Sequence, residues 1–254
     1  LGGKVVEADG GVVEQAARQW LDLPRGERER TMIFASGRRL RDAVNLTVQA
    51  GLRDKGELGG GSLTVRALDR VNLTNEELRY VHHYKPGRIV ELAKSIKAQR
   101  LPSGLYAVTG VNENGRVELV DAHGKAHRFD PDRIRPGQDN RIALHEQRER
   151  TIHTGDRIRW TTNDHRRGLL NADRATVTAI GKSHVDIETS TGMKMSLSKS
   201  DQMLSRIDLA YAHNAHMAQG MTTDKAIVVM EARDTKLLTR QNFLVSVTRV
   251  RDDL

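Results

Sequence analysis

Cysteine is absent from this chain of 254 residues, and aromatic residues make up only 4% of it. Without cysteine the chain can form no disulfide framework, thiolate zinc site or cysteine nucleophile, which fits a reducing compartment such as the cytoplasm. Apolar runs fall far short of the roughly 20 residues that a bilayer span needs, and no signal-peptide pattern opens the sequence. These absences exclude a small disulfide-stapled domain and predict no membrane insertion.

Positive charge is in excess. Lys and Arg number 41 against 33 Asp and Glu, so the net charge is 41 − 33 = 8, and the isoelectric point is about 9.9. A polyanion is therefore the first partner to consider, although a solvated basic surface explains the charge equally well. The chain begins at Leu1 and stops just after a strand-like run, and we interpret it as an excised fragment.

The outer parts of the sequence alternate between strand and helix patterns. Helical spacing over 11–21 ends before Pro24, and a short apolar run over 31–35 is followed by a second helical pattern that closes near Gly56. A plausible edge strand covers 63–67. Later apolar runs are separated by helix-sized intervals and predict buried parallel strands at Ile207–Ala210, Ala226–Met230 and Phe243–Val247.

The middle of the chain contains an internal repeat. After a capping-box pattern at Thr74–Glu77, strand alternation and turn residues continue to about Ser200. Matching segments recur at nearly constant offsets, 155 − 87 = 68, 177 − 108 = 69, 185 − 117 = 68 and 192 − 124 = 68. Asn114-Gly115 between two strand patterns predicts a type I′ hairpin. Two tandem β modules follow, each with five short strands typical of a small SH3-like barrel.

The fold class predicted is therefore α/β plus small β-barrels. Residues 1–72 and 203–254 are expected to form a discontinuous parallel α/β domain, interrupted by a first β module at 73–146 and a second at 147–202.

Three segments resemble motifs of superfamily-1 helicases of the RecD-like group. Tyr211–Thr222 is similar to motif V, usually Ala-Tyr-Ala-x-Thr-x-His-Lys-x-Gln-Gly, with His216, Gln219 and Gly220 on the pattern. The run Val245–Arg249 resembles motif VI, and Thr31–Asn45, which contains Arg41, resembles motif IV. The resemblance implies that the α/β domain is a partial RecA-like 2A domain and that Arg249 occupies the place of the arginine that reaches a nucleotide's terminal phosphate.

The second β module extends this resemblance. Gly155–Asp164 with Gly168, Asn171 and Val177 is similar to the SH3-like module inserted in that family, in particular in conjugative relaxase-helicases of the TraI/TrwC type. The two β modules would then be the 2B and 2B-like domains.

Departures from the motifs argue against a working motor. Asn214, Met217 and Ala218 replace the Thr, Lys and small hydroxyl residue of motif V. No Gly-x-x-x-x-Gly-Lys-Ser/Thr loop is present, and Gly181–Ser183 belongs to a hairpin turn. An isolated arginine has no nucleotide charge to stabilise without that loop. We expect no enzyme activity and no cofactor in this fragment. In the family, ATP and Mg serve the parent's active helicase, and a divalent metal serves its relaxase.

The resemblance to TraI proteins of F-like conjugative plasmids implies a specific role. In that family a helicase-like region that has lost its motor binds single-stranded DNA, and its second half is an internal translocation signal for type IV secretion. We expect this chain to be that part. The expected partners are the secretion coupling protein, single-stranded DNA and other domains of the parent. The expected location is the donor cytoplasm, followed by secretion into the recipient cell.

Several residues are candidates for these contacts. A single strand requires cations for its phosphates and a π surface for its bases. The DNA-binding candidates are Arg157, Arg159, Trp160, Asn163, Arg166, Arg167, Lys182, His216 and Gln219, and core packing is the favoured role of Trp160. The vestigial nucleotide-motif positions are Arg41, Gly220 and Arg249, and the secretion-surface candidates are Lys94, Lys97 and Arg100.

Other chemistry is unsupported. His213 and His216 are spaced for a metal but lack further ligands, and no catalytic triad or carboxylate pair can be assembled from spacing. Two alternatives stay open. One is the second half of an active ATP-dependent 5′ to 3′ helicase, and the other is an RNA-binding pair of β modules on an unrelated α/β domain.

Overall fold

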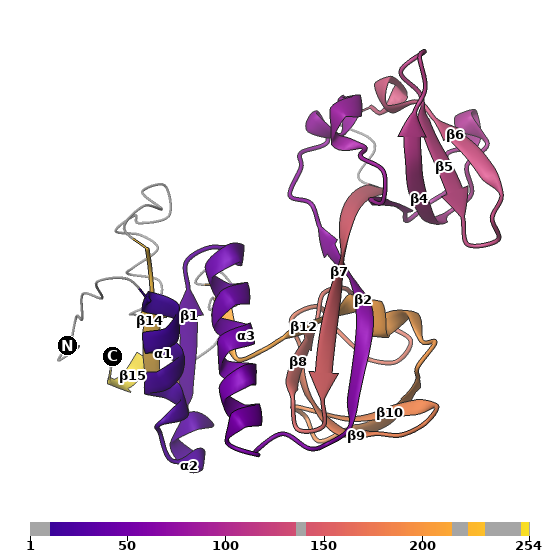
Figure 1. Ribbon diagram of the computed structural model, residues 1–254. Helices are drawn as coiled ribbons and strands as arrows, with labels where there is room; N and C mark the ends of the chain where they lie inside the picture. Colours follow the sequence, from indigo (N-terminus) through magenta and orange to yellow (C-terminus); the bar gives the residue numbers. More distant parts are fainter. Residues whose placement is uncertain (1–10, 136–140, 215–222, 232–249, 254) are drawn as a thin grey trace. The chain divides into compact units, whose positions relative to one another are not determined.

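A computed structural model describes residues 11–135, 141–214, 223–231 and 250–253 (Figure 1). The chain forms two compact units. Unit 1 is drawn from Leu1–Thr64 and Thr151–Leu254, and unit 2 is Val65–Arg150. The chain passes from one unit to the other twice, once within β2 (Ser62–Arg70) and once within β7 (Ile142–His153).

Unit 1 contains a parallel sheet in the order β13-β1-β14-β15. Its strands are β1 (Thr31–Ala35), β13 (Ala212–Asn214), β14 (Thr223–Val229) and β15 (Val250–Asp253). The helices of unit 1 are α1 (Val12–Leu21), α2 (Arg25–Arg28) and α3 (Arg38–Asp54). Helix α3 packs on β13 and β1, and α1 packs on β14 and β1 (Figure 1). This arrangement confirms an α/β layer with a parallel sheet.

Both long helices form where the apolar spacing predicts them. Helix α1 buries Ala16, Ala17, Trp20 and Leu21 on one face, and Trp20 Nε1 donates to the Thr31 carbonyl at 3.1 Å. Where α1 meets α3, a Cβ built on Gly51 would lie 2.3 Å from Leu21 Cδ1. A glycine at this point of α3 lets the two helices approach closely, which compensates for its poor helix propensity.

The second sheet of unit 1 is antiparallel, in the order β11-β10-β9-β8-β12. Its strands are β8 (Arg157–Trp160), β9 (Arg174–Ile180), β10 (His184–Thr189), β11 (Lys194–Ser198) and β12 (Ile207–Leu209), with the 3₁₀ helix η5 (Gln202–Arg206) before β12. The expected parallel strand at Ile207–Ala210 is wrong, because β12 pairs antiparallel with β8, and β13 takes the place in the parallel sheet. The run Phe243–Val247 lies outside the described residues.

Unit 2 has its own apolar core beneath a sheet in the order β2-β7-β3-β4-β5-β6. The further strands are β3 (Ile89–Leu92), β4 (Gly104–Val111), β5 (Val117–Asp121) and β6 (Ala126–Phe129), and the 3₁₀ helices are η1 (Glu77–Arg79), η2 (Val81–His83), η3 (Lys97–Gln99) and η4 (Pro131–Arg133). The capping box predicted at Thr74–Glu77 is present, since Thr74 N donates to Glu77 Oε2 at 2.7 Å and Glu77 N donates to Thr74 Oγ1 at 3.2 Å. It begins only the short η1.

The internal repeat is confirmed by strand order. Strands β3 to β6 form a meander with β7 beside β3, and β8 to β11 form a meander with β12 beside β8. Among the described residues β6 does not pair with β7, nor β11 with β12, so the paired strands do not close into barrels. The β4–β5 hairpin is confirmed, but its turn is not type I′, because only Gly115 and not Asn114 has a positive φ.

No described helix is long and apolar enough to cross a membrane.

Candidate nucleic-acid interface

Trp160 ends β8, and its side chain is 0% exposed. A buried ring cannot stack on a base, so Trp160 is a core residue and not a DNA-binding residue. This corrects its place among the candidates and agrees with the role that its sequence context favours.

Arg159 is also withdrawn from the surface. Its partner across the β8–β12 ladder is Asp208, and Arg159 Nη2 lies 2.7 Å from Asp208 Oδ2. Arg41 on α3 reaches the same oxygen at 2.9 Å and also pairs with Asp42. Burial lowers the pKa of Arg159, and the carboxylate of Asp208 opposes that shift. Asp208 thus holds two buried guanidinium groups, and neither is presented to a phosphate.

His213, on β13, lies within the field of these arginines. The side chain is 3% exposed, and burial together with Arg174, Arg159 and Arg41 lowers its pKa to about 3. His213 is therefore neutral at pH 7. This residue is thus a buried, neutral imidazole near three arginines.

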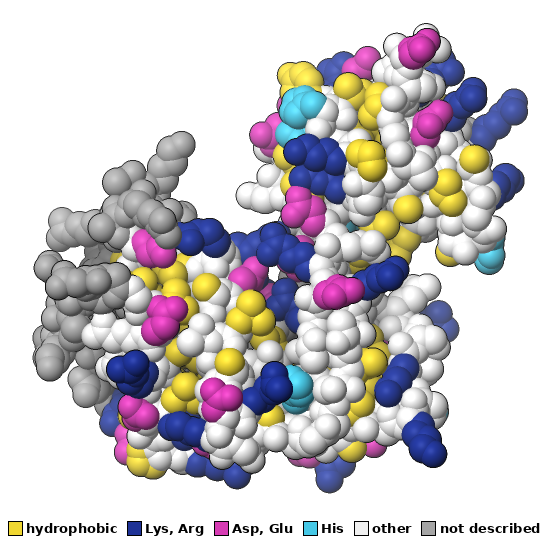
Figure 2. Space-filling view, in the orientation of Figure 1, with side chains coloured by type: hydrophobic (Ala, Val, Ile, Leu, Met, Phe, Trp, Pro, Cys, Tyr) yellow, Lys and Arg dark blue, Asp and Glu magenta, His cyan; other side chains and the backbone are white. Residues whose placement is uncertain are grey.

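The remaining candidates of the second sheet differ in what they can offer. Arg166 and Lys182 are exposed. Arg167 bonds Asp164 at 2.6 Å and Asp201 at 3.0 Å, and these bonds lower the pKa of both carboxyl groups. Asn163 Oδ1 accepts from the backbone N–H of Asn171 at 2.6 Å, which orders the loop. Of these residues, Arg166 and Lys182 are thus the cations left for a phosphate backbone. Figure 2 shows Lys and Arg side chains interspersed with acidic ones.

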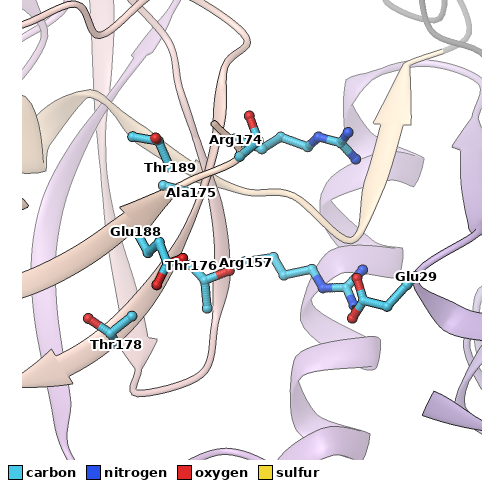
Figure 3. A pocket seen from close by; sticks show the side chains of 9 residues that line it. Glu29, Arg157, Arg174, Ala175, Thr176, Thr178, Glu188 and Thr189 are labelled. Atoms are coloured by element: carbon cyan, nitrogen blue, oxygen red, sulfur yellow. Dashed lines mark hydrogen bonds and ion pairs between the residues drawn. The ribbon is translucent and has the colours of Figure 1, made fainter. Parts of the chain in front are cut away.

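A polar groove of about 500 Å³ opens beside Arg157 and Arg174 (Figure 3). Arg157 Nη2 bonds Glu29 Oε1 at 2.5 Å, and its guanidinium lies 5.5 Å from the centre of the Trp20 ring. Burial and the neighbouring Arg157 lower the pKa of Arg174. The other groove residues are Ala175, Thr176, Thr178, Glu188, Thr189 and Ser190. Hydroxyls beside two guanidinium groups can bind an anion, although the two glutamates offset part of the charge.

A buried polar network fixes the segment that leads into motif V. Asn45 Oδ1 accepts from the backbone N–H groups of Tyr211 and Ala212 at 2.9 and 2.8 Å. Asp156 accepts from Tyr211 Oη and from Gln49 Nε2, each at 2.6 Å. Burial raises the pKa of Asp156, which these hydrogen bonds oppose. The sequence analysis did not identify Gln49 and Asp156 as members of this network. For Gln49 the available signal was a polar residue on the apolar face of α3.

The secretion-surface candidates Lys94, Lys97 and Arg100 are all exposed, around the short η3 of unit 2. Arg100 has a left-handed backbone, with φ 54°, at the end of η3. The described residues contain no group of three or more His, Asp or Glu side chains that could hold a metal. His216, Gln219, Gly220 and Arg249 lie outside the described residues.

Among comparisons with known proteins, the family match falls on unit 2. Residues 67–152 match the family model described as DNA relaxase TraI 2B/2B-like domain. This segment is similar to that domain. Over 204 residues the chain is also 28% identical to the multifunctional conjugation protein TraI of Escherichia coli, and the protein of strain K12 matches to the same extent. The resemblance to TraI-type relaxase-helicases is confirmed.

The TraI matches cover 80% of this chain but only 11% of the relatives' own length. Among solved structures, the Pif1 helicase from Bacteroides in complex with ADP-AlF3 and single-stranded DNA has a TM-score of 0.40 and 13% identity, covering 98% of this chain and 48% of that one. The Pif1 helicase from Candida albicans has a TM-score of 0.25 and 12% identity, covering 94% and 51%. TM-scores below 0.5 assign neither fold nor function to this chain.

Proposed function

We propose that this chain is an internal translocation signal of a conjugative relaxase-helicase, recognised by the coupling protein of a type IV secretion system. The signal is built on a helicase-like scaffold without a working motor, and the scaffold binds single-stranded DNA. In this proposal the parallel layer of unit 1 is the second half of a RecA-like 2A domain, and the two β meanders are SH3-like modules. The protein acts in the donor cytoplasm and enters the recipient cell.

The observation that carries the proposal is the TraI 2B/2B-like segment in a chain whose motif V lacks the Thr, Lys and small hydroxyl residue of the usual pattern. In a motor, those residues would couple DNA to nucleotide. Here Asn214, Met217 and Ala218 stand in their place. A domain that keeps its β modules without these couplers is better suited to being bound than to moving along DNA.

The environment of Arg41 supports the same conclusion. Its side chain is 5% exposed and pairs with two carboxylates, Asp42 at 2.7 Å and Asp208 at 2.9 Å. An arginine that recognises a phosphate needs its donors directed at the ligand. Releasing Arg41 for that purpose would leave buried charge behind, which costs several kcal/mol.

Single-stranded DNA binding is proposed on the exposed cations Arg166 and Lys182 and on the groove beside Arg157. Phosphate contacts release counterions, so affinity should fall steeply as salt rises. Changing both Arg166 and Lys182 to Ala should weaken binding and lower that salt slope. If the affinity of the unchanged chain does not vary with salt, the net charge of +8 is incidental to binding. A competition with structured RNA tests the RNA-binding alternative.

The translocation signal is tested by transfer. The chain, fused to a site-specific recombinase, should carry recombinase activity into recipient cells that share a conjugation machinery with the donor, and the unfused recombinase should not. Changing Lys94, Lys97 and Arg100 together to Ala should reduce transfer at least about tenfold if these side chains contribute about 1.4 kcal/mol to recognition. The matched control changes three other exposed basic residues of unit 2, Arg116, Lys125 and Arg128. Equal transfer by fused and unfused recombinase would refute the proposal.

The motor-dead state is tested in the full-length parent. The variant Arg249→Ala should leave ATP turnover unchanged, because the proposal gives this half no role in hydrolysis. Loss of turnover would instead establish the alternative, the second half of an active ATP-dependent 5′ to 3′ helicase.

A further inference from the structure

Unit 2 exposes an aromatic surface that is absent elsewhere among the described residues. Tyr80 is 58% exposed, whereas every other described aromatic side chain is buried. Those buried side chains are Trp20, Phe34, Tyr84, Tyr106, Phe129, Trp160 and Tyr211. A chain with so few aromatic residues gains no core packing from Tyr80, so this ring is available for a ligand.

Two histidine rings adjoin the ring of Tyr80. The Tyr80 and His82 rings stack with their centroids 5.9 Å apart and their planes at 25°. The His82 and His83 rings follow at 4.0 Å and 46°. We call Tyr80, His82 and His83 the aromatic ledge. A single exposed tyrosine is unremarkable on a protein surface, but here the exposed ring belongs to a group of three aromatic rings in contact.

The ledge is held in place from below. It lies on η1 and η2, which begin at the capping box of Thr74 and Glu77. The next aromatic residue, Tyr84, is buried, donates from its hydroxyl to the Leu78 carbonyl at 2.6 Å and meets Phe129 edge-on at 5.6 Å. A surface fixed in this way loses little conformational entropy when it binds, which favours affinity.

Basic side chains border the ledge. Lys85 is exposed, and Arg88 Nη1 donates to the His83 carbonyl at 2.7 Å. Burial is the main reason that the pKa of His83 is lowered; His82, Arg88 and Lys85 add to the shift, and Glu77 opposes it. In Figure 2 histidine side chains of the upper part lie near both basic and acidic side chains.

We propose that the aromatic ledge is a stacking site for the unpaired bases of single-stranded DNA, with Lys85 beside it for the phosphates. Every base has a π face, so such a platform binds single strands with little dependence on sequence, and nearby cations track the backbone. The inference rests on the DNA-binding part of the proposed function and names a site in unit 2, apart from the candidates of the second sheet. A duplex, whose bases are stacked and paired, should not compete.

Binding of a fluorescently labelled oligo(dT) to the whole chain tests the ledge. Stacking of one base contributes about 1–3 kcal/mol, so Tyr80→Ala should weaken binding about 5- to 150-fold. Tyr80→Phe keeps the ring and should bind as the unchanged chain does, and His82→Ala should also weaken binding. Val111→Ala is the matched control, because Val111 is an exposed apolar side chain of the same unit, 42% exposed. If Tyr80→Ala binds oligo(dT) with unchanged affinity, the inference is refuted. That result would also be found if the aromatic ledge bound a protein and not DNA.

A spectroscopic readout separates stacking from loss of folding. In the variant Tyr80→Trp the new indole is exposed, whereas Trp20 and Trp160 are 1% and 0% exposed. Oligo(dT) should quench its fluorescence, and an abasic oligonucleotide of the same length, which has phosphates without bases, should not. Equal quenching by both would refute stacking.

Failure of the ledge can be distinguished from failure of the proposed function. If the unchanged chain binds oligo(dT) and Tyr80→Ala binds equally well, the proposed stacking site is refuted but DNA binding by the chain is supported. If the unchanged chain binds no oligonucleotide, both the proposed stacking site and the DNA-binding part of the proposed function are refuted. The recombinase transfer assay reports on the translocation signal independently in either case.

Discussion

The hydroxyl of Tyr211 donates to Asp156 Oδ1 at 2.6 Å, which ties the residue between β12 and β13 to the turn that precedes β8. Asp156 is 0% exposed and also accepts from Gln49 and from the His153 N–H, each at 2.6 Å. One carboxylate therefore fixes α3, the second sheet and the entry to motif V together.

Removing the Tyr211 hydroxyl should destabilise unit 1. Tyr211→Phe leaves a buried carboxylate oxygen without its donor, and we expect a loss of about 1–3 kcal/mol in the free energy of unfolding. Urea denaturation followed by circular dichroism measures it. The control is Tyr80→Phe, which removes an exposed hydroxyl and should change stability by less than about 0.5 kcal/mol. Equal effects of the two changes would show that the Tyr211–Asp156 bond contributes nothing.

The two arginines on Asp208 make its charge indispensable. Asp208→Asn leaves Arg41 and Arg159 buried without their shared carboxylate, and breaking a buried ion pair in this way costs about 3–5 kcal/mol. The matched control is Asp22→Asn, because the Asp22 side chain is 66% exposed and its pair with Lys55 is long, at 3.5 Å. The control should cost less than about 1 kcal/mol. Thermal melting of both variants measures the loss of stability. If Asp208→Asn is as stable as Asp22→Asn, the buried ion pairs of Asp208 do not stabilise the fold as proposed.

His213 predicts a specific pH dependence of stability. Its pKa is lowered from 6.5 to about 3 by burial and by Arg174, Arg159 and Arg41. Between these two pH values the imidazole is protonated in the unfolded chain but not in the folded chain. Stability from this residue is complete above pH 6.5 and is lost as the pH falls from there toward 3, at about 1.4 kcal/mol per pH unit.

The variant His213→Gln should remove that slope. His165→Gln is the control, because His165 is an exposed histidine of the same unit and its replacement should leave the slope in place. Urea unfolding at a series of pH values between 7 and about 4 measures both. A slope that persists in His213→Gln would assign the acid sensitivity to other groups.

Asp121 in unit 2 titrates in a lower range. Its carboxylate lies 2.9 Å from His127 Nε2 and accepts from the backbone N–H groups of His123 and Lys125 at 2.9 and 3.0 Å. The bond with His127 is the main reason that the pKa of Asp121 is lowered from 3.8 to about 2. The stability from this contact is complete above pH 3.8 and is lost as the pH falls toward 2.

An NMR titration of the Asp121 carboxyl carbon should place its midpoint near 2 and, in His127→Ala, closer to 3.8. The variant His123→Ala keeps the backbone N–H and should leave the midpoint unchanged. Should His127→Ala leave the midpoint near 2, the imidazole is not its cause.

Local patterns predicted the helices and the repeat, because each depends on residues close in the sequence. The apolar spacing of α1 and α3 is a property of single helices, and the capping box at Thr74 and Glu77 satisfies the backbone over one turn. The constant offset near 68 residues predicted two meanders of the same strand order. Closure into barrels depends on pairing between strands distant in the sequence, so local patterns could not predict it.

Errors arose where long-range pairing decides the outcome. Ile207–Ala210 is apolar enough for a parallel strand, but apolar runs do not distinguish parallel pairing from burial in an antiparallel sheet. The register that sets Asp208 opposite Arg159 selects the second sheet. Arg159 likewise had the sequence context of a surface cation, because its carboxylate partner lies 49 residues away.

The strand that follows each meander returns to lie beside the strand that begins it. In unit 2 Ile89 on β3 lies opposite His145 on β7, and in unit 1 Ile158 on β8 lies opposite Leu209 on β12. A segment whose entry and exit coincide in space can be inserted into a host chain, duplicated or deleted as a cassette while the host strands keep their spacing. The shared strand order of the two meanders is the arrangement that duplication of one such cassette would produce.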